Sequence, residues 1–238
     1  MKRVNKSSLR RLPWLYLIYA LFNDLVWIVL FIVLANVESG GVKAMSFFLT
    51  LVGSIALPIV SILCIYGLID LSEYFRKSCY VYLLSMIFLM ANMILLFIIN
   101  MSNGDTGPFE ISILTEAREV LQDLRVPMDA LAAFFLLTGF AETLQKAKDQ
   151  RIYRKCNVMR RTIFFLGIVY CVFVLMVEIF SIFTDGGLWD ASGLYMAFSL
   201  LAIVVMVILV LVDIPVFMIL LKAARQTYEI LSSREETF

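Results

Sequence analysis

Residues 200–212 read LLAIVVMVILVLV, a run in which no side chain is polar or charged. The run lies within a longer apolar stretch, residues 191–221. An α-helix needs about 20 apolar residues to cross a hydrocarbon core of about 30 Å. The stretch is long enough for one crossing, and it predicts a transmembrane helix.

Five further stretches of the same kind precede it along the chain. Each should be helical, because lipid offers no hydrogen-bond partner to an open backbone edge. The sequence therefore predicts an all-α, polytopic membrane protein, in which residues 1–238 form a single transmembrane domain, a bundle of six transmembrane helices. The predicted spans are residues 13–36, 44–71, 79–101, 126–145, 162–184 and 191–221.

The composition of the whole chain agrees with this interpretation. Apolar residues make up 62% of the 238 residues, and the mean hydropathy is +0.92. Soluble domains contain roughly 45–50% apolar residues, and a soluble fold of this size could not bury the excess. The 20 basic and 19 acidic residues nearly cancel, so we expect no nucleic-acid partner, which would need a strongly basic surface.

The basic residues predict how the spans are threaded. Seventeen of the 20 Lys and Arg residues lie in the N-terminal arm, the 2–3 and 4–5 links and the tail, whereas Lys43, Arg118 and Arg125 lie on the opposite side. Loops rich in Lys and Arg remain in the cytoplasm. We therefore predict a multi-pass protein of the cell membrane with both termini cytoplasmic.

Two segments between the spans are predicted to be helical outside the membrane. Apolar residues between Ile113 and Leu124 recur at helical spacing, with acidic residues on the other face, which predicts an external amphipathic helix over residues 112–125. Residues 141–161 are predicted to form a cytosolic helical link, long enough for one continuous helix of about 30 Å. Its basic face would attract anionic lipid or a protein partner.

A faint internal similarity suggests that the bundle consists of three helical hairpins. The segments GLIDLS (67–72) and GFAETL (139–144) both carry a Gly-x-x-acid pattern near the end of an even-numbered span. Charged residues at the end of any helix that leaves a membrane would produce the same pattern, so both explanations stay open.

Three acidic residues, Asp24, Glu178 and Asp213, lie inside the predicted spans and are the first candidates for a functional site. An ionised side chain is costly there and usually faces the bundle interior. Counting about 1.5 Å per residue from the inner ends places Asp24, with its neighbour Asn23, and Asp213 about 14–16 Å deep. The two carboxyl groups would then meet near the midplane, in a proton or cation pathway. The alternative is interhelical hydrogen bonding, worth about 0.6–2 kcal/mol for each residue.

Two prolines inside spans should each free a backbone carbonyl group, which is a candidate cation ligand. Pro215 follows Asp213 by two residues and should free the carbonyl of Leu211, because proline lacks the N–H that this carbonyl would accept. Broken transporter helices coordinate cations with such carbonyls. Pro58 interrupts the second span in the same way, although proline kinks are also frequent in membrane helices for structural reasons alone.

Other chemistry has little support in the sequence. The chain contains no His, which is the commonest general base and metal ligand. It also lacks a phosphate-binding glycine loop and a cluster of residues with metal-ligand spacing. We therefore expect neither enzymatic activity nor a cofactor.

These features favour a membrane-embedded, permease-like subunit of a transport system, coupled to protons or cations. The alternative is a non-transporting membrane sensor, immunity or assembly protein that acts through its basic cytosolic helices. Besides the lipid bilayer, the predicted partners are a cytosolic or membrane protein bound through the 4–5 link, or further copies of the same chain.

Overall fold

The computed structural model describes residues 5–36, 52, 55–101, 108–145, 150–185 and 192–235. Within these residues every regular element is a helix, which confirms the all-α class. The elements are α1 (Lys6–Asn36), a short helix (Ile55–Tyr66), α3 (Glu73–Met101), α4 (Pro108–Leu144), α5 (Arg151–Asp185) and α6 (Ser192–Glu235).

Four helices of the described residues are long and apolar enough to cross a membrane. Because lipid tails satisfy apolar side chains and the helix satisfies its own backbone, these helices indicate a helical membrane protein. The crossing segments are Glu73–Leu95, Asp123–Leu144, Arg151–Phe180 and Gly193–Ser233.

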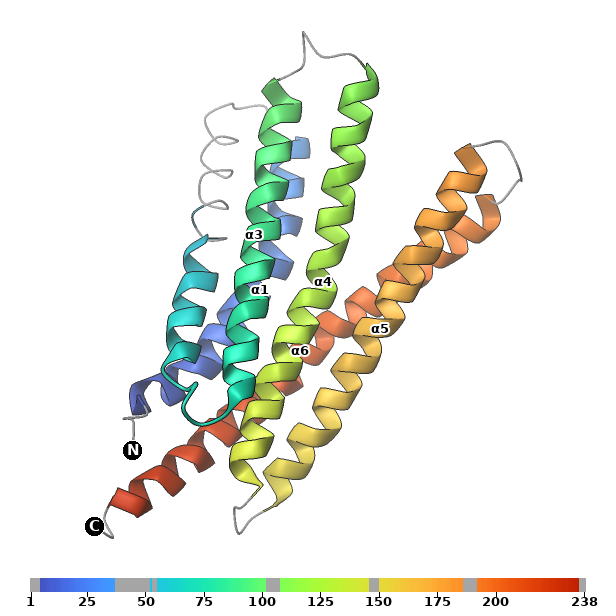
Figure 1. The fold of residues 1–238 in the computed structure, drawn as a ribbon. Coiled ribbons are helices and arrows are strands. Elements are labelled where there is room, and N and C mark those ends of the chain that lie inside the picture. The colour runs from blue at the N-terminus through green and yellow to red at the C-terminus, as the bar shows by residue number, and fades with distance from the viewer. Residues whose placement is uncertain are drawn as a thin grey trace.

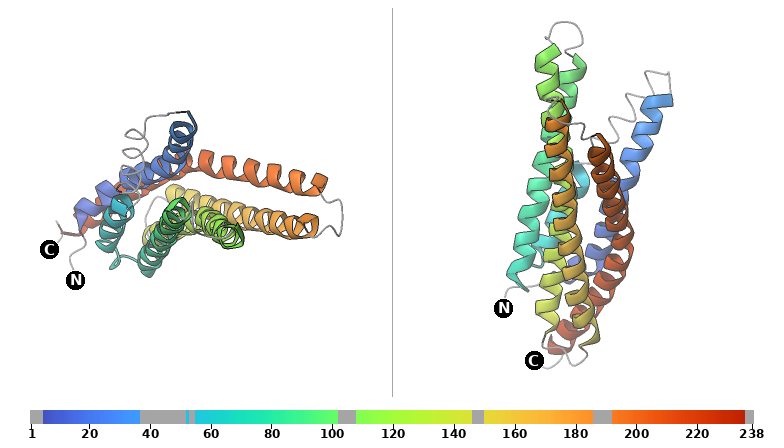
Figure 2. Two further views of the ribbon diagram at one scale, coloured as in Figure 1. Left: turned by 90° about the horizontal axis from the view of Figure 1, so that it is seen from above. Right: turned by 90° about the vertical axis from the view of Figure 1, so that its right-hand side faces the viewer.

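Successive helices run in opposite directions (Figure 1). α1 begins and α6 ends at the same end of the molecule, which we call the basal end; the opposite end is the distal end. α4 lies at the centre and contacts α3, α5 and α6, while α1 packs along α6. Seen from above, α5 and the first half of α6 extend away from the other helices as a pair (Figure 2).

The densest packing lies in the basal half, around α4. Leu136, Leu137 and Phe140 of α4 are completely buried. The ring of Phe75 on α3 meets Phe140 edge-on, with the ring centroids 5.2 Å apart. Gly139 permits this approach, because a Cβ atom at this position would lie only 3.1–3.2 Å from three atoms of the Phe75 ring.

The short helix ends against the beginning of α1. The backbone N–H of Asn5 donates to the Gly67 carbonyl at 3.3 Å, and the Cys64 thiol donates to the Ser8 carbonyl at 3.2 Å. A Cβ atom on Gly67 would approach Ser8 Oγ to 2.6 Å. Glycine is therefore needed where these two segments cross.

The structure corrects two predictions about the connecting segments. The predicted external helix over 112–125 is not a separate element, because α4 runs without interruption from Pro108 through Pro127 to Leu144. The predicted link over 141–161 is not one continuous helix, because α4 ends at Leu144 and α5 begins at Arg151. Within the second predicted span, residues 44–51, 53 and 54 lie outside the described residues.

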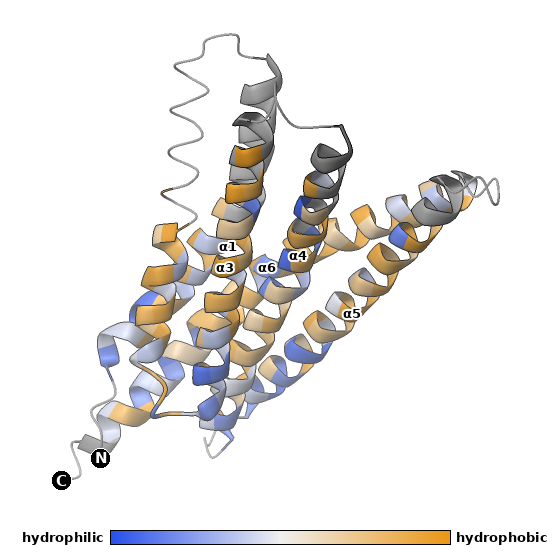
Figure 3. Ribbon diagram, turned by 45° about the horizontal axis from the view of Figure 1, so that its top comes forward, coloured by the Kyte–Doolittle hydropathy of each residue, from blue (hydrophilic) through white to orange (hydrophobic). Residues whose placement is uncertain are grey.

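Hydrophobic residues follow the helices along most of their length, and hydrophilic residues gather toward the basal end (Figure 3). In α3 and α4, 44% of the most apolar part of each span is buried within the protein, against 17% in α5 and 22% in α6. The α5–α6 pair thus presents most of its apolar surface outward.

Candidate functional site: a tyrosine–aspartate cluster

Two tyrosines of α1 place polar groups inside the apolar bundle. Tyr16 and Tyr19 lie three residues apart, so both project from the same face of the helix. Their side chains are buried, with exposed fractions of 4% and 6%. A buried phenol needs a hydrogen-bond partner. Tyr16 donates to a carboxylate of α6, and Tyr19 donates to a carboxylate of α4.

Tyr16 connects α1 to α6. Its phenolic O–H donates to Asp213 Oδ1 with an oxygen–oxygen distance of 2.5 Å. Hydrogen bonds from a hydroxyl to an ionised carboxylate are about 2.5–2.7 Å long and roughly twice as strong as neutral ones. Asp213 is half-buried, and this bond fixes its side chain on the α1 side of α6.

Tyr19 connects α1 to α3 and α4. Its O–H donates to Asp129 Oδ1 on α4 at 2.9 Å, and the same oxygen accepts from Ser85 Oγ on α3 at 3.3 Å. The guanidinium Nε of Arg125 lies 3.9 Å from Asp129 Oδ2, one helical turn away. Asp129 therefore collects donors from three helices.

Tyr82 of α3 packs against Tyr19 beside these carboxylates. Its side chain is 2% exposed, and its ring meets that of Tyr19 edge-on, with centroids 5.1 Å apart. We call the following residues the tyrosine–aspartate cluster: Tyr16, Tyr19, Tyr82, Ser85, Asp129 and Asp213.

Asp213 lies well inside the apolar part of α6, and Asp129 lies six residues inside the span that begins at Asp123 on α4. Counted along the helix axes at about 1.5 Å per residue, Asp213 is about 14 Å from Lys222, and Asp129 is about 22 Å from Leu144. Carboxylate and hydroxyl oxygens at this depth can exchange a proton or coordinate a monovalent cation. Among the described residues no group of three or more His, Cys, Asp and Glu side chains is placed to bind a metal ion.

The structure places the sequence-predicted candidates in different positions. Asp213 belongs to the cluster, whereas Glu178 is exposed on α5. Pro215 is half-buried on α6, and Pro58 is buried in the short helix. Asn23 and Asp24 lie on α1, but their side chains are outside the described residues, so the predicted meeting of Asp24 with Asp213 stays a prediction.

Sequence analysis missed most of the cluster. Asp129 lies near an end of the fourth predicted span, and the composition counts tyrosine among the apolar residues. A signal was nevertheless present, because Tyr16 with Tyr19, and Tyr82 with Ser85, form hydroxyl pairs at i, i+3 within two spans. Such a pair puts two hydrogen-bonding groups on one face of a helix.

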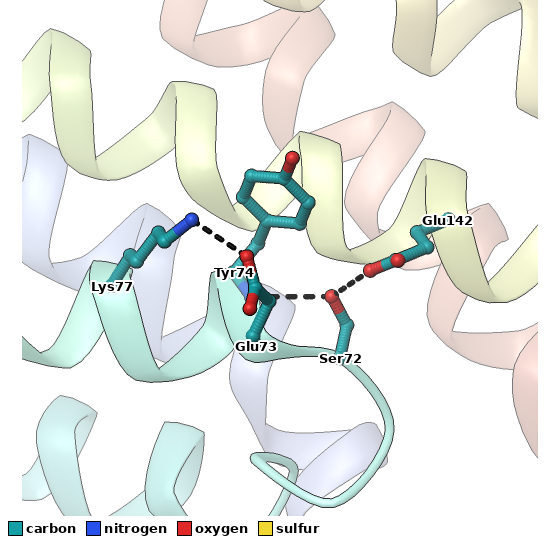
Figure 4. Close-up of polar contacts among 5 residues, drawn as sticks. All are labelled: Ser72, Glu73, Tyr74, Lys77 and Glu142. Atoms are coloured by element: carbon teal, nitrogen blue, oxygen red, sulfur yellow. Dashed lines mark hydrogen bonds and ion pairs between the residues drawn. The ribbon is translucent and has the colours of Figure 1, made fainter.

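A second polar contact lies at the basal end, where α3 begins (Figure 4). Ser72 caps α3, since its Oγ accepts from the Tyr74 backbone N–H at 3.2 Å. The same hydroxyl donates to Glu142 Oε2, near the end of α4. Lys77 and Glu73 form an ion pair on the outer side, 2.7 Å apart. The hydrogen bond between Ser72 and Glu142 holds the beginning of α3 against the end of α4, and we assign it a structural role.

Comparisons with protein-family models, with curated proteins and with solved structures found no match to this chain. The class that the fold and composition define is a helical membrane protein. Its function is therefore inferred from the cluster itself.

Proposed function

We propose that the protein is a membrane-embedded, permease-like subunit of a transport system that is coupled to protons or cations. The observation that carries this proposal is the pair of intramembrane carboxylates, Asp129 and Asp213, held by two hydroxyls of the single helix α1. Ionisable residues within spans are costly, and in membrane proteins they commonly mark ion pathways.

The hydrogen bonds suggest how proton or cation binding would be coupled to helix movement. An ionised carboxylate only accepts hydrogen bonds, and a protonated one also donates. Protonating Asp213, or placing a cation on it, weakens its role as an acceptor for Tyr16 and so weakens the contact between α1 and α6. Because Tyr19 holds Asp129 from the same helix, movement of α1 would change both sites together.

We further propose that the protein lies in the cell membrane with its basal end in the cytoplasm. This orientation rests on the excess of basic residues beside the termini and the 4–5 link. It is tested in a chain whose four cysteines have been replaced, carrying either Gln150→Cys or Gly193→Cys. In intact cells an impermeant thiol reagent should label Gly193→Cys and not Gln150→Cys; the reverse pattern would overturn the orientation.

Flux through the purified protein in proteoliposomes tests the transport proposal. The vesicles contain a pH-sensitive dye, and proton movement is driven by a potassium diffusion potential, with Na⁺ present or absent. The flux into vesicles that contain wild-type protein should exceed the flux into protein-free vesicles. Asp213→Asn and Asp129→Asn should each lower this flux at least about tenfold. Glu178→Gln is the matched control, because this acid is exposed on α5, and it should keep the wild-type flux.

A flux equal to that of protein-free vesicles, or full flux in both Asn variants, would reject the proposal. The first result would favour the non-transporting alternative, which has its own supporting observation. Arg151, Arg154 and Lys155 at the basal start of α5 are all exposed, and they offer a basic surface to a cytosolic partner of a sensor, immunity or assembly protein. On this alternative, neutralising these three residues should have the same effect in cells as loss of the whole protein, whereas Asp213→Asn should have no effect.

A further inference from the structure

A cavity of about 440 Å³ opens at the basal end, between the beginning of α1 and the last part of α6. These are the two helices that Tyr16 and Asp213 join deeper in the bundle. The cavity lies where the apolar part of both helices gives way to charged residues, which is the level of lipid headgroups. Its walls have two chemically different sides.

One side of the cavity is apolar. Leu9 and Trp14 of α1 and Leu221 of α6 contribute to it. The Trp14 ring packs on Phe217 of α6, with the ring centroids 5.1 Å apart, yet 53% of the residue remains exposed. Tryptophan in this position is typical of a membrane interface, because its ring is apolar and its N–H is polar.

The other side of the cavity is basic. The guanidinium carbon of Arg10 lies 4.7 Å from the centroid of the Tyr228 ring, a cation–π distance, and Lys6 approaches the same ring at 5.7 Å. Arg225 pairs through Nε with Glu229 at 3.3 Å, while its side chain remains 84% exposed. Two cations, Arg10 and Arg225, and one acid, Glu229, line the cavity, so the lining carries a net positive charge.

We propose that this cavity binds the headgroup of an anionic phospholipid. Arg10 and Arg225 lie on different helices, and their guanidinium groups would bind the phosphodiester oxygens from two directions. The acyl chains would follow the apolar side, past Trp14 and Leu221. A soluble phosphate ion offers the same anionic group without the chains, and the apolar side favours the lipid. The bound lipid would bridge α1 and α6, which is a role beyond the transport proposed above.

Trp14 serves as the reporter for the test. In a Trp27→Phe/Trp189→Phe background it is the sole tryptophan of the chain. Its fluorescence is followed in detergent solution during titration with short-chain phosphatidylglycerol, phosphatidylcholine or inorganic phosphate. Phosphatidylglycerol should give a saturable change that the other two do not give at the same concentration.

Removing the charge of Arg10 or of Arg225 should raise the Kd for phosphatidylglycerol. A basic residue near an anionic lipid surface contributes roughly a fivefold gain in affinity, so Arg10→Gln and Arg225→Gln should each raise the Kd about fivefold, and together about 25-fold. The control is Arg76→Gln, which removes one exposed charge from α3 and should leave the Kd unchanged. Thermal unfolding of each variant without lipid shows whether it is folded.

Three results would overturn the proposal. Equal affinity for phosphatidylcholine would show that headgroup charge is not recognised. An equal response to inorganic phosphate would assign the site to a soluble anion. An undiminished affinity in folded Arg10→Gln/Arg225→Gln protein would place the lipid elsewhere on the molecule.

Discussion

The basal half of the bundle and the distal half of the α5–α6 pair both belong to helices apolar enough to cross a membrane, but they are packed in different ways. In the basal half, α1, α3, α4 and α6 enclose buried side chains and the tyrosine–aspartate cluster. In the distal half, α5 and α6 meet through aromatic rings such as Phe180 and Phe198, stacked with centroids 5.3 Å apart. Most other side chains there point outward.

This difference shows what determines packing within a membrane. Lipid tails are as apolar as leucine, so an apolar face gains little by leaving lipid for another helix. Small residues that permit close approach, and polar groups that need partners, decide which helices associate. The basal half has both, at Gly139 and at Asp129, whereas the described residues in the distal half of α5 and α6 meet through aromatic rings.

The largest difference between the halves should appear on truncating a leucine. Leu136 on α4 is completely buried, and Leu211 on α6 is 61% exposed. Leu136→Ala should lower the free energy of unfolding by about 3 kcal/mol, because it leaves a cavity, and Leu211→Ala by less than about 0.5 kcal/mol. Equilibrium unfolding in mixed detergent micelles measures both. Equal losses would mean that the two halves are packed alike.

A second pair of variants adds volume instead of removing it. Gly139→Leu forces a side chain into the Phe75 ring, whereas nothing lies within 4 Å of a Cβ atom at Gly193. Overpacking of this kind costs about 1–3 kcal/mol, so Gly139→Leu should lower the unfolding temperature while Gly193→Leu leaves it unchanged. If Gly193→Leu is the more damaging variant, the distal surface is covered by another protein and not by lipid.

The smallest difference concerns one hydroxyl group. Tyr16→Phe removes the donor to Asp213 and keeps the ring, and it should destabilise the fold by about 1 kcal/mol. Tyr80→Phe is the control, because Tyr80 is 63% exposed on α3, and it should have no measurable effect. Both are measured by the same unfolding experiment. No loss in Tyr16→Phe would show that the Tyr16 bond adds nothing to the α1–α6 contact.

Hydropathy predicted an all-α fold with six spans, because crossing a membrane fixes both length and composition. The structure confirms the all-α class and four such spans among the described residues, and the six-helix bundle stays a prediction. Hydropathy could not predict how the helices pack. The chain continues as a helix through Pro127, so the predicted external helix and the predicted fourth span form one element. Amphipathic spacing in residues 112–125 indicated a separate helix, but the same spacing also fits the outer part of a long helix.

The candidate site was predicted only in part, for a similar reason. Depth along a helix can be counted from the sequence, and it singled out Asp213. The partner of Asp213 depends on which face of α1 meets α6, and that is set by side-chain packing across more than a hundred residues of chain. Counting depth along a helix therefore could not identify Tyr16 as the partner of Asp213. It also did not select Asp129, which lies near an end of the fourth predicted span.

The central claim is that the cluster carboxyl groups take up and release a proton or cation within the membrane. Infrared difference spectroscopy of the protein in lipid, between acidic and alkaline buffer, tests it most directly, because the carbonyl stretch of a protonated carboxyl group is resolved from that of a carboxylate. A carboxyl band that disappears in Asp213→Asn or Asp129→Asn, and remains in Glu178→Gln, is the predicted result. A difference spectrum that neither Asn variant alters would contradict the claim, since the cluster would then be a fixed structural contact.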